Sequence, residues 1–224
     1  MTTRPTFPSV MVFAASSFLA LCTAQSQLTA TYQVSGSGVD SQEITFATDG
    51  SKLRIDVPDK VSIVISPEQD SVLMIQHDAK MAMQVPYSQV ASSLDRVVKQ
   101  EAPDSMQATG ETETIAGFAC EIYEITTDGS KGKVWLTQDL PAWKDAAASL
   151  AGSMKSLSPQ IGEFYDSFSD QGFMVKSEWS DSGKSMNYIL QSVSTEPVPA
   201  ERFAKPSGYN SFQLPSGYEQ FLPR

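Results

Sequence analysis

Short apolar or alternating stretches, separated by turn signals, make up most of the first hundred residues. The clearest cover residues 28–34, 44–46, 53–57, 61–65, 72–75 and 81–85. Because successive side chains of a strand point to opposite faces, a period of two predicts a sheet with one apolar face. Asp49-Gly50 and the polar segment 77–80 favour tight turns between neighbouring stretches. This part of the chain is therefore predicted to form an antiparallel meander of about six strands.

Helical spacing of apolar residues interrupts the strands at three places. One stripe starts near Tyr87 and ends at Pro103, a second runs from Trp143 to Leu157, and a third follows Ser158-Pro159. Stretches typical of strands return in residues 109–126, 133–137, 173–179 and 186–193. The sequence predicts an α+β fold in which a few short helices cover a large curved antiparallel sheet.

Residues 1–24 have the features of a secretory signal peptide. A single positive charge at Arg4 precedes an apolar run over residues 10–22, which is too short to span a bilayer. Cys22 and Ala24 are the small residues that a signal-peptide cleavage site requires, so we expect cleavage after Ala24. The remaining residues, 25–224, are then expected to form a single domain. A second interpretation is lipidation of Cys22, although Leu21 is bulkier than the residue that normally precedes a lipidated cysteine.

The composition excludes several classes of function. A net charge of −10 argues against a nucleic-acid partner and against anionic membrane surfaces, which both require a basic face. One His and two Cys provide too few ligands for a metal centre, and the chain has no G-x-S-x-G, H-E-x-x-H, C-x-x-C or P-loop motif. We therefore predict a protein that is not an enzyme and has no catalytic residue, metal site or cofactor.

Two residues that could carry chemistry have structural interpretations. His77 stands beside Asp78 in a predicted turn and is expected in solvent. Cys120 shares strand parity with Phe118 and Ile122, so it is expected in the core as an inert thiol.

The C-terminal region contains a short repeat. Residues 203–209, with the sequence Phe-Ala-Lys-Pro-Ser-Gly-Tyr, recur as Phe-Gln-Leu-Pro-Ser-Gly-Tyr over residues 212–218. Pro-Ser-Gly favours a turn, and the flanking aromatic residues can hold the segment on a surface. We expect a tail docked by aromatic anchors, and the alternative is a peptide-recognition motif.

Methionine is frequent after the predicted signal peptide, where seven of these residues remain. Methionine is flexible and polarizable, which suits surfaces that repack around varied apolar ligands, but these residues also suit an ordinary core. Together with tryptophan and with the helical stripes they could line a cavity between sheet and helices. The candidate lining residues are Met81, Met83, Trp135, Trp143, Leu150, Met154, Phe164 and Phe168.

Two segments resemble the DUF4412 family of exported bacterial proteins. They are residues 114–123 (TIAGFACEIY) and 133–141 (KVWLTQDLP), and residues 212–218 are similar to the family's aromatic and Pro-x-Gly-Tyr ending. The hairpins over residues 50–54 and 71–85 resemble the lipoprotein carrier and receptor superfamily, the LolA and LolB group. This resemblance implies an unclosed half-barrel with helices over its concave face and an apolar cavity that takes acyl chains.

The resemblance implies no catalytic residues. Arg54 stands where a carrier's strand arginine could lie, but the proline-bearing segment that usually follows is missing. We therefore expect Arg54 to face solvent.

The leading hypothesis is an exported, periplasmic or secreted binding protein that holds an apolar ligand, such as a lipid or a lipoprotein acyl chain. It predicts no stable membrane insertion after signal cleavage. The alternative is a cell-envelope interaction or sensor module with a filled core. A hydrolase that uses carboxylates is a third hypothesis.

Overall fold

The computed structural model describes residues 27–90, 105–127, 130–155, 159, 166, 170–181 and 184–212. Its strands are β1 (Leu28–Gly36), β2 (Val39–Thr48), β3 (Leu53–Val57), β4 (Val61–Ser66), β5 (Ser71–Gln76), β6 (Met81–Pro86), β7 (Ser105–Ile115), β8 (Phe118–Thr127), β9 (Ser130–Thr137), β10 (Phe173–Asp181), β11 (Lys184–Ser194) and β12 (Asn210–Phe212). Its helical elements include the α-helix α2 (Pro141–Lys155) and two short 3₁₀-helices, η1 (Pro67–Gln69) and η2 (Ala200–Phe203).

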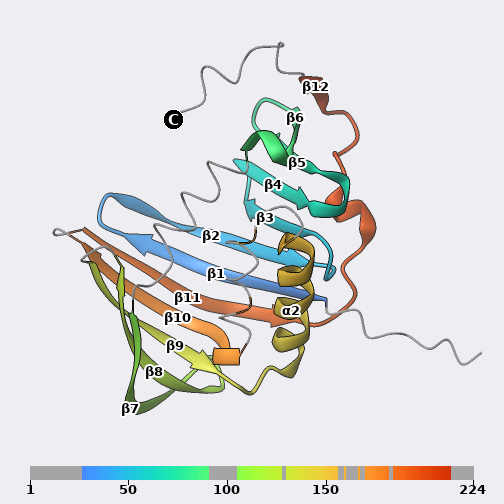
Figure 1. Cartoon of the computed structure of the whole chain (residues 1–224). Coiled ribbons are helices and arrows are strands. Elements are labelled where there is room, and N and C mark those ends of the chain that lie inside the picture. The colour runs from blue at the N-terminus through green and yellow to red at the C-terminus, as the bar shows by residue number, and fades with distance from the viewer. Residues whose placement is uncertain are drawn as a thin grey trace, which may run out of the picture.

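All twelve strands belong to one sheet (Figure 1). Their order is β12-β6-β5-β4-β3-β2-β1-β11-β10-β9-β8-β7, so β12 and β7 lie at its two edges. Every pair is antiparallel except β12 with β6, which is parallel. The expected unclosed antiparallel sheet with few helices is therefore confirmed.

Local sequence explains the alternation of β1 and the turn between β2 and β3. The residues of β1 alternate between buried and partly buried from Leu28 to Ser35, as the period of two predicts. Between β2 and β3, Asp49 Oδ1 accepts hydrogen bonds from the backbone N–H groups of Ser51 and Lys52, and Gly50 has a φ of 90°. A glycine reaches this φ without the steric cost that a side chain would add, so the Asp-Gly pair fixes the turn.

Helix α2 lies across one face of the sheet (Figure 1). Its fully buried residues include Ala146, Ala147 and Ala151, whose small side chains allow the helix to approach closely. The larger Leu150 and Met154 lie on the same buried side of the helix. The predicted amphipathic stripe is thus the packing surface of α2, and we call the face of β1–β6 that it covers the inner face.

Several sequence-based expectations concern residues outside the described ranges. They are the signal peptide with Cys22 and Ala24, the helix beyond residue 90, most of the third helix with Phe164 and Phe168, and the second copy of the tail repeat after Phe212. Residues 87–90 are helical, in agreement with the expected start near Tyr87. No helix in the described ranges is both long enough and apolar enough to cross a membrane.

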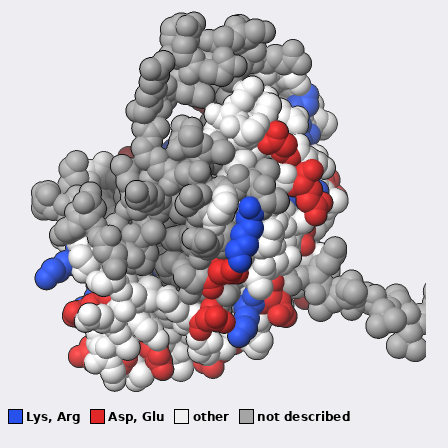
Figure 2. Space-filling model, viewed as in Figure 1, with Lys and Arg blue, Asp and Glu red and all other residues white. Residues whose placement is uncertain are grey.

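The visible surface in Figure 2 carries more acidic than basic side chains. This distribution agrees with the net charge of −10.

Candidate ligand-binding site

The part of the inner face beneath α2 is a closed apolar contact. Leu150 and Met154 pack in one cluster with Leu53, Val72 and Val85, all of them buried. Strand register places these three sheet residues in one row across β3–β6, together with Ile65. Helix α2 therefore covers this row.

The neighbouring row on the same face is apolar but only partly buried. Direct strand pairing joins its five members across β2–β6, which are Phe46, Ile55, Ile63, Met74 and Met83. We call these five residues the apolar row. A continuous strip of partly buried apolar side chains on five adjacent strands is a feature of surfaces that bind an apolar partner.

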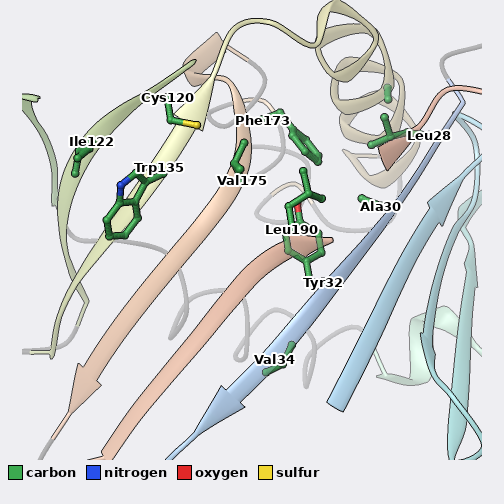
Figure 3. Packing of buried hydrophobic residues seen from close by; sticks show 11 residues of the cluster. Leu28, Ala30, Tyr32, Val34, Cys120, Ile122, Trp135, Phe173, Val175 and Leu190 are labelled. Carbon is green, nitrogen blue, oxygen red and sulfur yellow. The ribbon is translucent and has the colours of Figure 1, made fainter. Parts of the chain in front are cut away.

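A second apolar cluster holds the other part of the sheet together (Figure 3). Tyr32 lies in it, with ring centroids 5.9 Å from Phe46 and 6.4 Å from Phe173. The Tyr32 hydroxyl donates a 2.6 Å hydrogen bond to the carbonyl of Met174, and burial raises the pKa of Tyr32. This hydrogen bond satisfies the buried hydroxyl, so the cluster is a packed core.

The candidate lining residues divide between these two clusters. Met83, Leu150 and Met154 meet in the cluster beneath α2, and Met81 lies on the same strand face as Met83 and is partly buried. Trp143 packs against Phe173 in the cluster of Figure 3, with ring centroids 5.6 Å apart.

Trp135 belongs to the same cluster as Trp143 and is held by polar groups. Its indole N–H donates to Glu113 Oε2 at 2.7 Å, and Lys176 Nζ lies 4.1 Å from its ring centroid. These contacts fix the ring at the margin of the core. The structure thus brings three of the candidate residues together and places the two tryptophans elsewhere.

Cys120 is buried and unpaired, as expected from its strand parity. Burial raises the pKa of its thiol, and the nearby carboxylates of Glu113 and Asp139 raise this pKa further. A higher pKa leaves less thiolate at neutral pH, so Cys120 is a weak nucleophile.

Cys120 is therefore expected to react slowly with iodoacetamide in the native protein and rapidly in denaturant. Replacement of Cys120 by Ala should lower the free energy of unfolding by about 1–2 kcal/mol, because it leaves a small cavity. Mass spectrometry of timed labelling and urea unfolding measure these effects. Equal labelling rates in the native and denatured protein would contradict the burial of the thiol.

The opposite face of β3–β6, here called the outer face, carries a polar network that the sequence did not indicate. Arg54 is only 9% exposed, so the expectation that it faces solvent is wrong. Its Nε donates to Asp56 Oδ1 at 2.6 Å, its Nη2 donates to Ser62 Oγ at 2.9 Å, and its Nη1 donates to the carbonyl of Arg202.

His77 also belongs to this network, and the expectation of a solvated turn histidine is wrong. Its Nε2 lies 2.7 Å from Ser62 Oγ, and its Nδ1 lies 2.9 Å from the Tyr209 hydroxyl oxygen. Ser62 donates its own proton to Asp56 at 2.5 Å, so Nε2 is the donor toward Ser62, and in the neutral imidazole Nδ1 then accepts from the Tyr209 hydroxyl. Ser62 therefore lacks the hydrogen bond to an accepting imidazole that activates a serine nucleophile.

This network lies beneath the C-terminal segment, residues 198–212, which crosses the outer face. Phe203 is buried against Ala47, Val64 and Val198, and the ring of Tyr209 contacts the ring of His77 edge-on. The expected docking of the tail by aromatic anchors is thus confirmed for the first copy of the repeat.

A cleft of about 580 Å³ lies between this segment and the outer face. Its sheet side includes Ser66, Ser71 and Leu73, and its other side includes Phe203 and Lys205. We call it the outer cleft. Strand alternation places it on the face opposite the apolar row.

Comparison with known proteins gives a family and several distant structural likenesses. None of the curated proteins matches the chain. The structure of PNGF-II in space group C2 is 15% identical, with a TM-score of 0.43 over 87% of this chain and 32% of that chain. The present chain thus spans about a third of the length of PNGF-II.

Two shorter proteins match over most of their length. LprF from Mycobacterium bovis is 10% identical, with a TM-score of 0.37 over 84% of this chain and 92% of that chain. The LolA superfamily protein NE2245 from Nitrosomonas europaea is 10% identical, with a TM-score of 0.31 over 81% of this chain and 91% of that chain. The model of a family described as "Domain of unknown function (DUF4412)" matches residues 28–209. The chain therefore belongs to the DUF4412 family, which the sequence motifs had indicated.

Proposed function

We propose that this protein is an exported, non-enzymatic binding protein whose inner sheet face holds an apolar ligand, such as a lipid or a lipoprotein acyl chain. The apolar row is the observation that carries this proposal. Its five side chains lie on adjacent strands, and at the usual strand spacing they extend over about 19 Å. The features of residues 1–24 support export to the periplasm or out of the cell.

The chemistry of the row suits a flexible apolar chain. Met74 and Met83 pair directly at its β5–β6 end, where their unbranched side chains can adjust to ligands of different shape. Leu150 and Met154 of α2 border the row from the neighbouring contact. The proposed site consists of these four residues with Phe46, Ile55 and Ile63, and Met81 extends it toward the start of β6.

The surface charge restricts the cargo. An acidic surface disfavours anionic headgroups near the site, so neutral or zwitterionic lipids and lipoproteins suit it better than free fatty acids.

Monoacylglycerols of increasing chain length are expected to bind with an affinity that rises with length and then reaches a plateau. Each methylene group transferred from water into the site contributes about 0.8 kcal/mol, so chains of about eight to ten carbons reach micromolar dissociation constants after the cost of association. Displacement of the neutral fluorescent probe N-phenyl-1-naphthylamine from the delipidated protein measures these constants.

Substitution of Met83 by Gln tests whether the ligand binds at the inner face. The change keeps the length of the side chain but adds a polar amide. We expect about tenfold weaker binding, because burying an amide without a partner costs on the order of 1–3 kcal/mol. Met186→Gln is the matched control, since Met186 is 37% exposed on β11, which is not one of the strands of the apolar row. The proposed site would be refuted if the affinity were the same at every chain length, or if Met83→Gln and Met186→Gln lost the same affinity. A protein-interaction module would then be the better hypothesis.

A further inference from the structure

The outer cleft differs in charge from the rest of the molecule. Two lysines, Lys52 and Lys205, line it, whereas none of its described lining residues is Asp or Glu. The lining of the cleft is thus more positive than the chain as a whole, which has a net charge of −10, and Asp49 balances part of the Lys52 charge from 3.9 Å away.

The two lysines are held in different ways. Lys205 Nζ donates to the carbonyl of Tyr209 at 3.0 Å and to Ser211 Oγ at 2.8 Å, so its charge is fixed on the C-terminal segment. Lys52 Nζ forms an ion pair with Asp49 Oδ2 at 3.9 Å, beyond hydrogen-bond distance, and lies 5.8 Å from the ring centroid of Phe203. The Lys52 ammonium therefore keeps its capacity to donate hydrogen bonds to a ligand in the cleft.

The sheet side of the cleft provides neutral polar groups. Ser71 Oγ accepts a 2.8 Å hydrogen bond from Gln84 Nε2, and both Ser66 and Ser71 are buried. Ser66 Oγ makes no hydrogen bond to any described residue, although it lines the cleft. Because Ser66 lines the cleft, its hydroxyl can donate a hydrogen bond to a bound molecule.

The remaining lining is apolar. Leu73, Ala82 and Phe203 are joined by Phe212, which is 44% exposed at the edge strand β12. A ligand in this cleft would thus contact apolar or aromatic surface together with hydroxyl and ammonium groups. A volume of about 580 Å³ lies within the range of small-molecule sites.

The wall formed by the C-terminal segment is fixed at several points. Tyr209 contacts His77, Asn210 N donates to the carbonyl of Lys80 at 2.9 Å, and Arg202 Nη2 lies 3.5 Å from Asp56 Oδ2. Because this wall is already held in place, binding a ligand does not require the segment to lose much conformational entropy.

We propose that the outer cleft is a second binding site, separate from the inner face, for a small organic anion with an aromatic or apolar body. Lys52 and Lys205 contact its anionic group, Ser66 donates a hydrogen bond to it, and Phe203 and Phe212 pack against its apolar part.

The test uses 1-anilinonaphthalene-8-sulfonate, an aromatic sulfonate, as the probe anion and the full exported protein. Fluorescence titration of wild type should give saturable binding that weakens as salt is raised. Lys52→Met should weaken the affinity about tenfold, as expected for one lost charge-assisted hydrogen bond. The Lys52 side chain is 27% exposed, so this variant is expected to fold.

Lys131→Met is the matched control, since it removes the same charge from an exposed position on β9 outside the cleft. Its affinity for the sulfonate should equal that of wild type, and Ser66→Ala should weaken binding a few-fold. The neutral probe N-phenyl-1-naphthylamine should bind Lys52→Met as it binds wild type.

Several results would overturn the proposal. They are the absence of sulfonate binding by wild type, and equal affinities in Lys52→Met and Lys131→Met. Sulfonate binding that is lost in Met83→Gln and kept in Lys52→Met would place the anion on the inner face instead. Because the inner-face site is tested with neutral probes and its own variants, either proposal can fail while the other stands.

Discussion

Replacement of Asp56 by Ala is expected to lower the free energy of unfolding by about 3–5 kcal/mol. The carboxylate accepts hydrogen bonds from Arg54 and from Ser62, and it also lies near the guanidinium of Arg202. Without the Asp56 carboxylate, the Arg54 cation stays buried at the same desolvation cost but has no counter-charge. It also lies close to the Arg202 cation, which repels it. Urea unfolding monitored by circular dichroism gives the difference in stability.

A solvent-exposed ion pair of the same chain provides the control. Lys144 Nζ and Asp170 Oδ1 are 3.2 Å apart with side chains 70% and 77% exposed, so Asp170→Ala should cost less than about 1 kcal/mol. In the double variant Arg54→Met with Asp56→Leu, both charges are absent, and its loss of stability should be clearly smaller than the sum of the single losses. Equal costs for Asp56→Ala and Asp170→Ala would show that the outer-face network does not stabilise the fold.

The parts of the fold that the sequence predicted are those set by neighbours in the chain. Asp49-Gly50 defines one turn, and the period of two fixes which side chains of each hairpin share a face. The pairing of β1 with β11 is different, because it joins Thr29 to Ser194 across most of the chain. Periodicity assigns each strand an apolar face but does not specify its partner, so this pairing could not be predicted.

Arg54 shows the same limit at the level of a side chain. Its alternation with Leu53 and Ile55 correctly places it on the polar face of β3, and a polar face is normally solvated. The C-terminal segment covers that face and supplies the carbonyl of Arg202, 148 residues away. The aromatic repeat indicated that the tail docks, but nothing in its sequence specified the surface on which it does so.

For the candidate site, the sequence likewise predicted the positions of single residues but not their arrangement. Parity placed Met83 on the apolar face of its strand, and helical spacing placed Leu150 and Met154 on the packed side of α2. The apolar row as a whole depends on the register of five strands, which sets Phe46 beside Ile55 and Met74 beside Met83. Register follows from turn geometry and packing together, so a linear pattern does not reveal it.

Met154→Ala is expected to lower the free energy of unfolding by about 2–4 kcal/mol, because truncation of a buried side chain removes apolar contacts and leaves a cavity. Met154 is 1% exposed, between α2 and the inner face. Met186→Ala makes the same chemical change at a 37% exposed position and should cost less than about 1 kcal/mol. Urea unfolding of both variants measures the difference. Equal costs would mean that Met154 is not packed against the sheet, and α2 would then not border the apolar row on which the proposed ligand site depends.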